Sequence, residues 1–126
     1  MDTLPHVPPF RWVDKILDRD PPRRCVVLKI FSAGESLLRD VEEVPFPLVV
    51  ESLCQAAAFL HAEPPTQEGR IAALEEVEMT GPVRPGDRLV ITVGLLEEGT
   101  EAMKAESRGE VEGRMVARLR VLILKK

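Results

Sequence analysis

Few residues of this chain combine a reactive side chain with an apolar setting. Glu51, Cys54 and Gln55 stand within one apolar stretch, and the two histidines are His6 and His61. A carboxylate or an imidazole can serve as general acid or base, and a thiolate can serve as nucleophile. In a helix, Glu51 and Gln55 would lie about 40° apart on one face, so both could address one bound group.

Each of these residues also has a simpler interpretation. The helix dipole stabilises a glutamate such as Glu51 near a helix start, although an unpaired carboxylate among apolar residues is costly. Gln55 could be a core amide with satisfied hydrogen bonds. His61 fits a helix carboxyl end, where the dipole favours positive charge, and His6 fits a structural hydrogen-bonding role. Cys54 has no neighbouring histidine to lower its pKa, so we do not expect it to be a nucleophile.

The element that would position these residues is a helix predicted over residues 48–62. This range contains no proline or glycine and is rich in alanine and leucine, and Pro47 is acceptable at a first helical position. Pro64 and Pro65 would end the helix. Its apolar residues point in nearly every direction, so we expect it to be enclosed on most sides.

Strands are predicted on both sides of this helix. A short extended segment over residues 12–17 and a turn over residues 18–22 precede an alternating strand over residues 25–30. Further strands are predicted over residues 71–79, 89–96, 102–109 and 114–124, with turn residues at 85–87, 98–99 and 112–113. Two strands, one helix and four strands describe an α+β fold in which an antiparallel sheet wraps around one long central helix.

Length and composition limit the class of protein. The 126 residues fit a single domain spanning residues 1–126, with a net charge of −4 and no basic block longer than two residues. That charge argues against nucleic acid and membranes as partners. No metal-ligand spacing is present, and we expect no cofactor. Both cysteines stand in apolar surroundings and should be reduced, and the first residues lack a secretory signal, so we expect a cytoplasmic protein.

Three stretches resemble the hot-dog-fold 3-hydroxyacyl-[acyl-carrier-protein] dehydratases. Residues 4–17, LPHVPPFRWVDKIL, resemble the family's LPHRPPFLLVDRVL, and residues 49–57, VVESLCQAA, resemble its central-helix VEALAQAA. Residues 82–89, PVRPGDRL, resemble its PVxPGDxL, and residues 111–113, VEG, stand where the family commonly has VDG. The resemblance spans nearly the whole chain in the right order and implies a hot-dog fold.

The resemblance also implies a chemistry and a departure from it. The family removes a proton α to a thioester carbonyl and protonates the leaving 3-hydroxyl, using a histidine and a helix carboxylate. Glu51 matches that carboxylate, with Gln55 as the second candidate catalytic residue. The family's histidine lies in a GHFPxxPxxPG loop, whereas residues 32–47 here contain no histidine and are about four residues shorter. This segment more closely resembles dehydratase-like proteins found beside aryl-polyene synthesis enzymes, some of them inactive partners of an active paralogue.

These features lead to several functional expectations. We expect a binder of acyl-acyl-carrier-protein or acyl-CoA thioesters whose dehydratase activity is weak or lost. The alternatives are an acyl-CoA thioesterase using Glu51, a non-catalytic subunit of a heteromeric dehydratase, and a structural domain that binds no acyl group. If the chain were active, Asp40, Glu42 or Glu43 would be the residues to test as the replacement base.

The expected acyl site lies at the amino end of the helix, where free backbone N–H groups and the helix dipole would polarise a thioester carbonyl. Val49, Val50 and Ser52 are the substrate-binding residues predicted there, and Ala58 is predicted to contact the acyl chain on the face of Glu51. A helix that is apolar nearly all round also indicates at least a homodimer with a continuous sheet, or a heteromer with an active paralogue.

Overall fold

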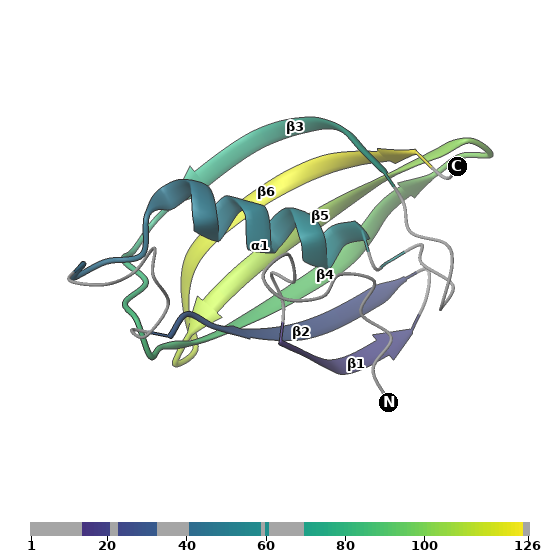
Figure 1. Cartoon of the computed structure of the whole chain (residues 1–126). Coiled ribbons are helices and arrows are strands. Elements are labelled where there is room, and N and C mark those ends of the chain that lie inside the picture. Colours follow the sequence, from purple (N-terminus) through teal and green to yellow (C-terminus); the bar gives the residue numbers. More distant parts are fainter. Residues whose placement is uncertain (1–13, 21–22, 33–40, 59, 61–69, 125–126) are drawn as a thin grey trace.

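The computed structural model describes residues 14–20, 23–32, 41–58, 60 and 70–124. Two strands, one helix and four further strands follow one another as predicted (Figure 1). The elements are β1 (Lys15–Asp20), β2 (Arg24–Ile30), α1 (Phe46–Ala58), β3 (Arg70–Met79), β4 (Arg88–Glu98), β5 (Ala102–Val111) and β6 (Arg114–Leu124).

The six strands form one antiparallel sheet in the order β1-β2-β4-β5-β6-β3. The sheet curves around α1, which lies along its concave face (Figure 1). Because α1 carries the chain across the sheet, β3 follows β2 in sequence but pairs with β6 at the opposite edge. The predicted α+β architecture, with an antiparallel sheet wrapped around one long helix, is confirmed.

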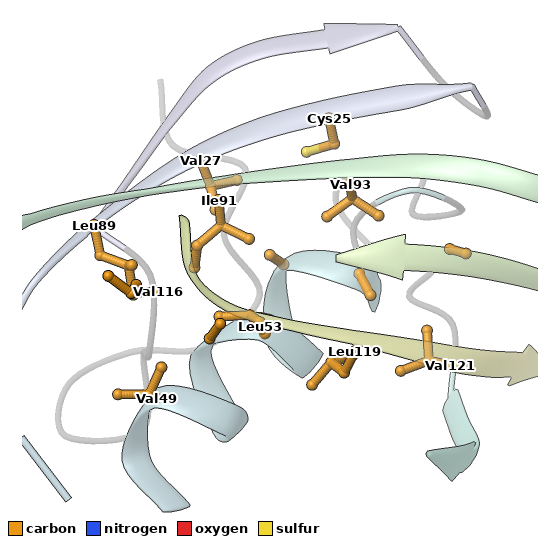
Figure 2. Packing of buried hydrophobic residues seen from close by; sticks show 14 of the residues in the cluster. Cys25, Val27, Val49, Leu53, Leu89, Ile91, Val93, Val116, Leu119 and Val121 are labelled. Carbon is orange, nitrogen blue, oxygen red and sulfur yellow. The ribbon is translucent and has the colours of Figure 1, made fainter. Parts of the chain in front are cut away.

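The core lies between α1 and the sheet. Val49 and Leu53 of the helix point toward sheet residues such as Ile91 and Leu119, and all four are buried (Figure 2). This arrangement follows from the period of two in a strand, which turns alternate side chains toward the helix. In β6 the buried residues Ala117, Leu119, Val121 and Ile123 alternate with partly exposed ones that include two arginines.

Two contacts fix the depth at which the helix sits on β5. The Ser107 hydroxyl, which is buried, donates a hydrogen bond of 3.0 Å to the Leu53 carbonyl oxygen. At Gly109, a Cβ atom would come within 3.0 Å of Leu89 Cδ1 and 3.4 Å of Leu53 Cδ1. A side chain at that position would therefore push the helix or Leu89 aside, so glycine permits the close approach.

The predicted turns connect the strands as expected. Pro85 and Gly86 form the corner of a turn closed by a 3.0 Å hydrogen bond from the Asp87 N–H to the Arg84 carbonyl oxygen. Gly86 has a φ of 95°, which a type II turn requires at its third position. Glu112 and Gly113 both have positive φ, 53° and 78°, as in the type I′ turns that suit two-residue hairpins.

Three predictions need correction. Residues 18–20 belong to β1 and not to a turn, because β1 pairs with β2 down to Asp20 opposite Arg24. α1 begins at Phe46 and ends at Ala58, and the predicted extension to residue 62 lies outside the described residues except for Leu60. The described residues leave part of the α1 surface open, since Phe46 is 45% exposed and Glu51 is exposed. No helix within the described ranges is long and apolar enough to cross a membrane.

Candidate active site on the open side of the helix

Glu51 and Gln55 lie together on the side of α1 that the sheet does not cover. The Gln55 Nε2 atom donates a hydrogen bond of 3.3 Å to Glu51 Oε2. Glu51 is exposed and Gln55 is half-buried. The spacing of four residues places them one turn apart, so the shared face predicted from the sequence is found. A carboxylate held by an amide can accept or donate a proton beside a bound carbonyl group.

The thiol beside this pair is not poised to react. Cys54 is half-buried and free. Burial and, to a lesser extent, the negative charge of Glu51 raise the pKa of its thiol to about 11. Cys25, in the core under β2, is also free, and burial raises its pKa to about 11 against an opposing effect of Arg19. Both thiols are therefore protonated near neutral pH, and Cys54 is unsuited to nucleophilic attack.

The four predicted substrate-binding residues fall on different sides of α1. Val50 and Ala58 are half-buried, and Ala58 lies about 20° around the helix from Glu51. Val49 and Ser52 are fully buried on the sheet side. The Ser52 hydroxyl donates a 3.1 Å hydrogen bond to the Leu48 carbonyl oxygen within the helix. The side chains of Val49 and Ser52 therefore belong to the core, because rotations of about 160° and 100° separate them from Glu51.

The free N–H groups predicted at the amino end of the helix do not include those of Leu48 and Val49. The N–H groups of Leu48 and Val49 both donate to the Pro45 carbonyl oxygen, at 3.0 and 3.4 Å. Pro47 has no N–H group to offer. The first turn of α1 thus uses these donors in its own hydrogen bonds. Of the two features predicted to polarise a thioester carbonyl, free N–H groups and the helix dipole, the dipole remains at this end of the helix.

An open hollow of about 430 Å³, which no local sequence pattern predicts, lies beside the amino end of α1. It forms where the segment before the helix meets the loop after β3, and a 2.7 Å hydrogen bond from the Val44 N–H to the Val83 carbonyl oxygen joins the two. Its walls are mostly apolar and include one carboxylate: Glu43, Val44, Phe46, Met79, Gly81, Pro82 and Val83. Glu51 does not line it, so the hollow and the Glu51–Gln55 pair are separate features.

Among the described residues, the remaining sequence candidates add no second reactive group beside Glu51. Glu42 and Glu43 are exposed. Asp40, His6 and His61 lie outside the described residues. In the described part of the chain, no group of three His, Cys, Asp or Glu side chains is placed to hold a metal ion.

Comparison with known proteins places this geometry in a family. No family model matches the chain. The 3-hydroxyacyl-[acyl-carrier-protein] dehydratase FabZ of Ruminiclostridium cellulolyticum is 30% identical over 123 residues, which cover 92% of this chain and 87% of that protein.

Solved structures share the fold. The dehydratase heterocomplex ApeI:P from Xenorhabdus doucetiae gives a TM-score of 0.79 at 15% identity, covering 98% of this chain and 88% of that one. A hypothetical thioesterase with coenzyme A from Streptococcus pneumoniae gives a TM-score of 0.75 at 12% identity. The match covers 89% of this chain and 84% of that one. With a six-stranded antiparallel sheet around one helix, the chain has the predicted hot-dog fold and belongs to the FabZ-like family of 3-hydroxyacyl-[acyl-carrier-protein] dehydratases.

Proposed function

We propose that this protein binds an acyl group held as a thioester, on acyl carrier protein or coenzyme A, against the open side of α1. The observation that carries the proposal is the hydrogen-bonded Glu51–Gln55 pair on a helix side that the described residues leave uncovered. Relatives named as acyl-carrier-protein dehydratases and a neighbour solved with coenzyme A support a thioester as the ligand.

The proposed dehydratase activity is weak or lost. Dehydration needs a base for the α-proton and an acid for the leaving hydroxyl, and Glu51 supplies one of the two. Residues 32–47 contain no histidine to supply the other. Loss of one acid–base partner typically lowers a rate by a factor on the order of 10² to 10⁴. Hydration of a 2-enoyl thioester followed by absorbance should therefore be slow, and a rate near 10 per second would refute this step.

A thioesterase is the second candidate function. Hydrolysis of a thioester needs one carboxylate to activate water or to attack the carbonyl, and the exposed Glu51 meets that requirement. The solved neighbour described as a thioesterase with coenzyme A favours the same chemistry. Release of free thiol from acyl-coenzyme A would distinguish this reaction from dehydration, which leaves the thioester bond intact.

The proposed setting is a cytoplasmic assembly of at least two hot-dog subunits. Cys25 and Cys54 are free, as expected where thiols are kept reduced. A homodimer would cover apolar surface such as Phe46, which is 45% exposed. A heteromer with an active paralogue is the alternative, supported by the solved dehydratase heterocomplex.

Calorimetric titration with a non-hydrolysable acyl-coenzyme A analogue and with acyl carrier protein tests the binding proposal. The parent protein should bind at least one of them. Ala58→Trp fills the helix face about 20° from Glu51 and should weaken binding tenfold or more. Thr100→Trp, at an exposed loop position, is the control and should bind as the parent does. No binding by the parent would refute the binding proposal, and full binding by Ala58→Trp would place the acyl site elsewhere.

A further inference from the structure

The hollow beside the amino end of α1 has no role in the proposed reaction. Its walls come from residues 43–46 before the helix and 79–83 after β3, two segments that lie side by side at this end of the molecule (Figure 1). Neither Glu51 nor Gln55 lines it. A concave site with mostly apolar walls and few polar groups is the usual form of a small-molecule site. The hollow is therefore a candidate site of its own.

Hydrogen bonds fix the shape of the hollow. The Val44 N–H donates to the Val83 carbonyl oxygen at 2.7 Å, and both side chains are buried. On the other side, the Thr80 and Gly81 N–H groups both donate to the Val116 carbonyl oxygen of β6, at 2.8 and 3.3 Å. The two segments are thus fixed to each other and to the sheet, so the hollow is formed before anything binds.

The open form of the hollow argues against a purely hydrocarbon occupant. Phe46 is 45% exposed and Met79 is half-buried, so these side chains offer apolar contact where water also reaches. Apolar surface is stabilised by leaving water, and an alkyl chain lying here would stay partly in contact with it. An occupant with both apolar and polar groups suits these walls better.

Glu43 limits the occupant further. It is exposed and is the one charged residue among the described residues that line the hollow. Within the described ranges, its carboxylate has no hydrogen-bond or ion-pair partner. A phosphate or carboxylate beside it would be repelled, and the positive end of the helix dipole at Phe46 disfavours a cation. A neutral N–H donor would form a charge-assisted hydrogen bond with it.

We propose that the hollow binds the amide-containing arm that links an acyl group to its carrier. Coenzyme A and acyl carrier protein both hold acyl groups on a pantetheine arm, in which secondary amides alternate with short apolar segments. An amide N–H of this arm donates to the Glu43 carboxylate, and the apolar segments lie against Phe46 and Met79. The inference rests on the proposed function, because it assigns the non-reacting part of the same ligand to a site of its own.

The spacing along α1 allows the arm and the thioester to be bound at once. Phe46 and Glu51 are separated by about 7.5 Å along the helix and about 140° around it. The pantetheine arm has a backbone about as long as four amino-acid residues and spans about 14 Å when extended. An arm in the hollow is therefore long enough to place the thioester beside Glu51. Binding of the non-reacting arm then positions the reacting carbonyl group.

Calorimetric titration with free pantetheine tests the inference. The parent should bind pantetheine, and Glu43→Ala should weaken that binding at least fivefold because a charge-assisted hydrogen bond is lost. Phe46→Ala should weaken it by a similar factor through loss of apolar contact. Glu42→Ala is the matched control, because Glu42 is also exposed but does not line the hollow. It should bind pantetheine as the parent does, with circular dichroism confirming that all three variants fold.

Competitors test the class of ligand. Decanoate has no N–H donor and hexylammonium is cationic, so neither should displace pantetheine from the parent. Displacement by decanoate would assign the hollow to a hydrocarbon chain, and displacement by hexylammonium would assign it to a cation. Either result would overturn the inference, as would equal binding of pantetheine by Glu43→Ala and Glu42→Ala or no binding by the parent.

The same variants separate this inference from the proposed function. If the acyl-coenzyme A analogue bound equally well to the parent and to Glu43→Ala, the inference would fail and the acyl-binding proposal would stand. Glu43-dependent binding of pantetheine that an attached acyl group did not strengthen would support the inference and refute the acyl site.

Discussion

The two sides of α1 are specified by different requirements. On the sheet side, Val49, Leu53 and Ala56 are fully buried, and their types follow from the shape of the space that they fill. On the open side, Glu51 and Gln55 contact each other and stay accessible. The comparison teaches that one helix can have a side determined by packing within the chain and a side that packing within the described residues does not determine.

The sharpest way to test this contrast is to truncate one residue on each side. Leu53→Ala removes a side chain that is fully buried between α1 and the sheet, and we expect a loss of about 3 kcal/mol in the free energy of unfolding. Urea denaturation followed by circular dichroism measures it. A loss below about 1 kcal/mol would mean that the helix is not seated on the sheet as described.

The buried thiol of Cys25 gives the next largest effect, and it depends on pH. Burial raises its pKa from 9.0 to about 11, so between these values the unfolded chain loses its proton while the folded chain keeps it. Stability from this group is fully present below pH 9 and is lost as pH rises toward 11. The loss is on the order of 2 kcal/mol. Cys25→Ala should reduce the slope of the stability profile above pH 9, with Cys54 contributing the remainder, and an unchanged slope would contradict this account.

The hydrogen bond from Ser107 to the Leu53 carbonyl oxygen contributes less. Ser107→Ala removes a buried donor, and we expect a loss of about 1 kcal/mol in unfolding free energy, measured by urea denaturation. Thr100→Ala, at an exposed loop position, should change stability by less than about 0.5 kcal/mol. Equal effects of the two substitutions would show that the bond does not hold the helix on β5.

The smallest change in stability is expected on the open side. Gln55→Ala should alter the unfolding free energy by less than about 0.5 kcal/mol, because the side chain contacts Glu51 near solvent. Thioester turnover, if present, should fall. If stability instead fell by more than about 1 kcal/mol with turnover unchanged, Gln55 would be a core amide and not part of a site.

The fold could be predicted because its signals are local in sequence. Alternation in residues 114–124 and the Glu112-Gly113 turn each specify a strand or hairpin without reference to distant parts of the chain. The Glu51–Gln55 pair could be predicted for the same reason, since a spacing of four residues sets their geometry within one helix.

The rest of the site depends on position in three dimensions. The hollow beside the amino end of α1 exists because Val44 bonds to Val83, a contact between segments about forty residues apart that no local pattern indicates. The sequence-based prediction places Val49 and Ser52 at the substrate because of their place along the helix. Their angle around the helix axis directs them into the core instead.

The measurement that tests the central claim most directly compares binding and chemistry in Glu51→Gln. This substitution keeps the shape of the side chain and removes its charge. Calorimetry with the non-hydrolysable acyl-coenzyme A analogue should give a dissociation constant within about threefold of the parent, since a factor of three is less than 1 kcal/mol. Assays of thiol release and of 2-enoyl hydration should detect no activity above background. Glu101→Gln, at an exposed loop position, is the control. Full activity in Glu51→Gln would contradict the account, as would loss of binding without loss of fold.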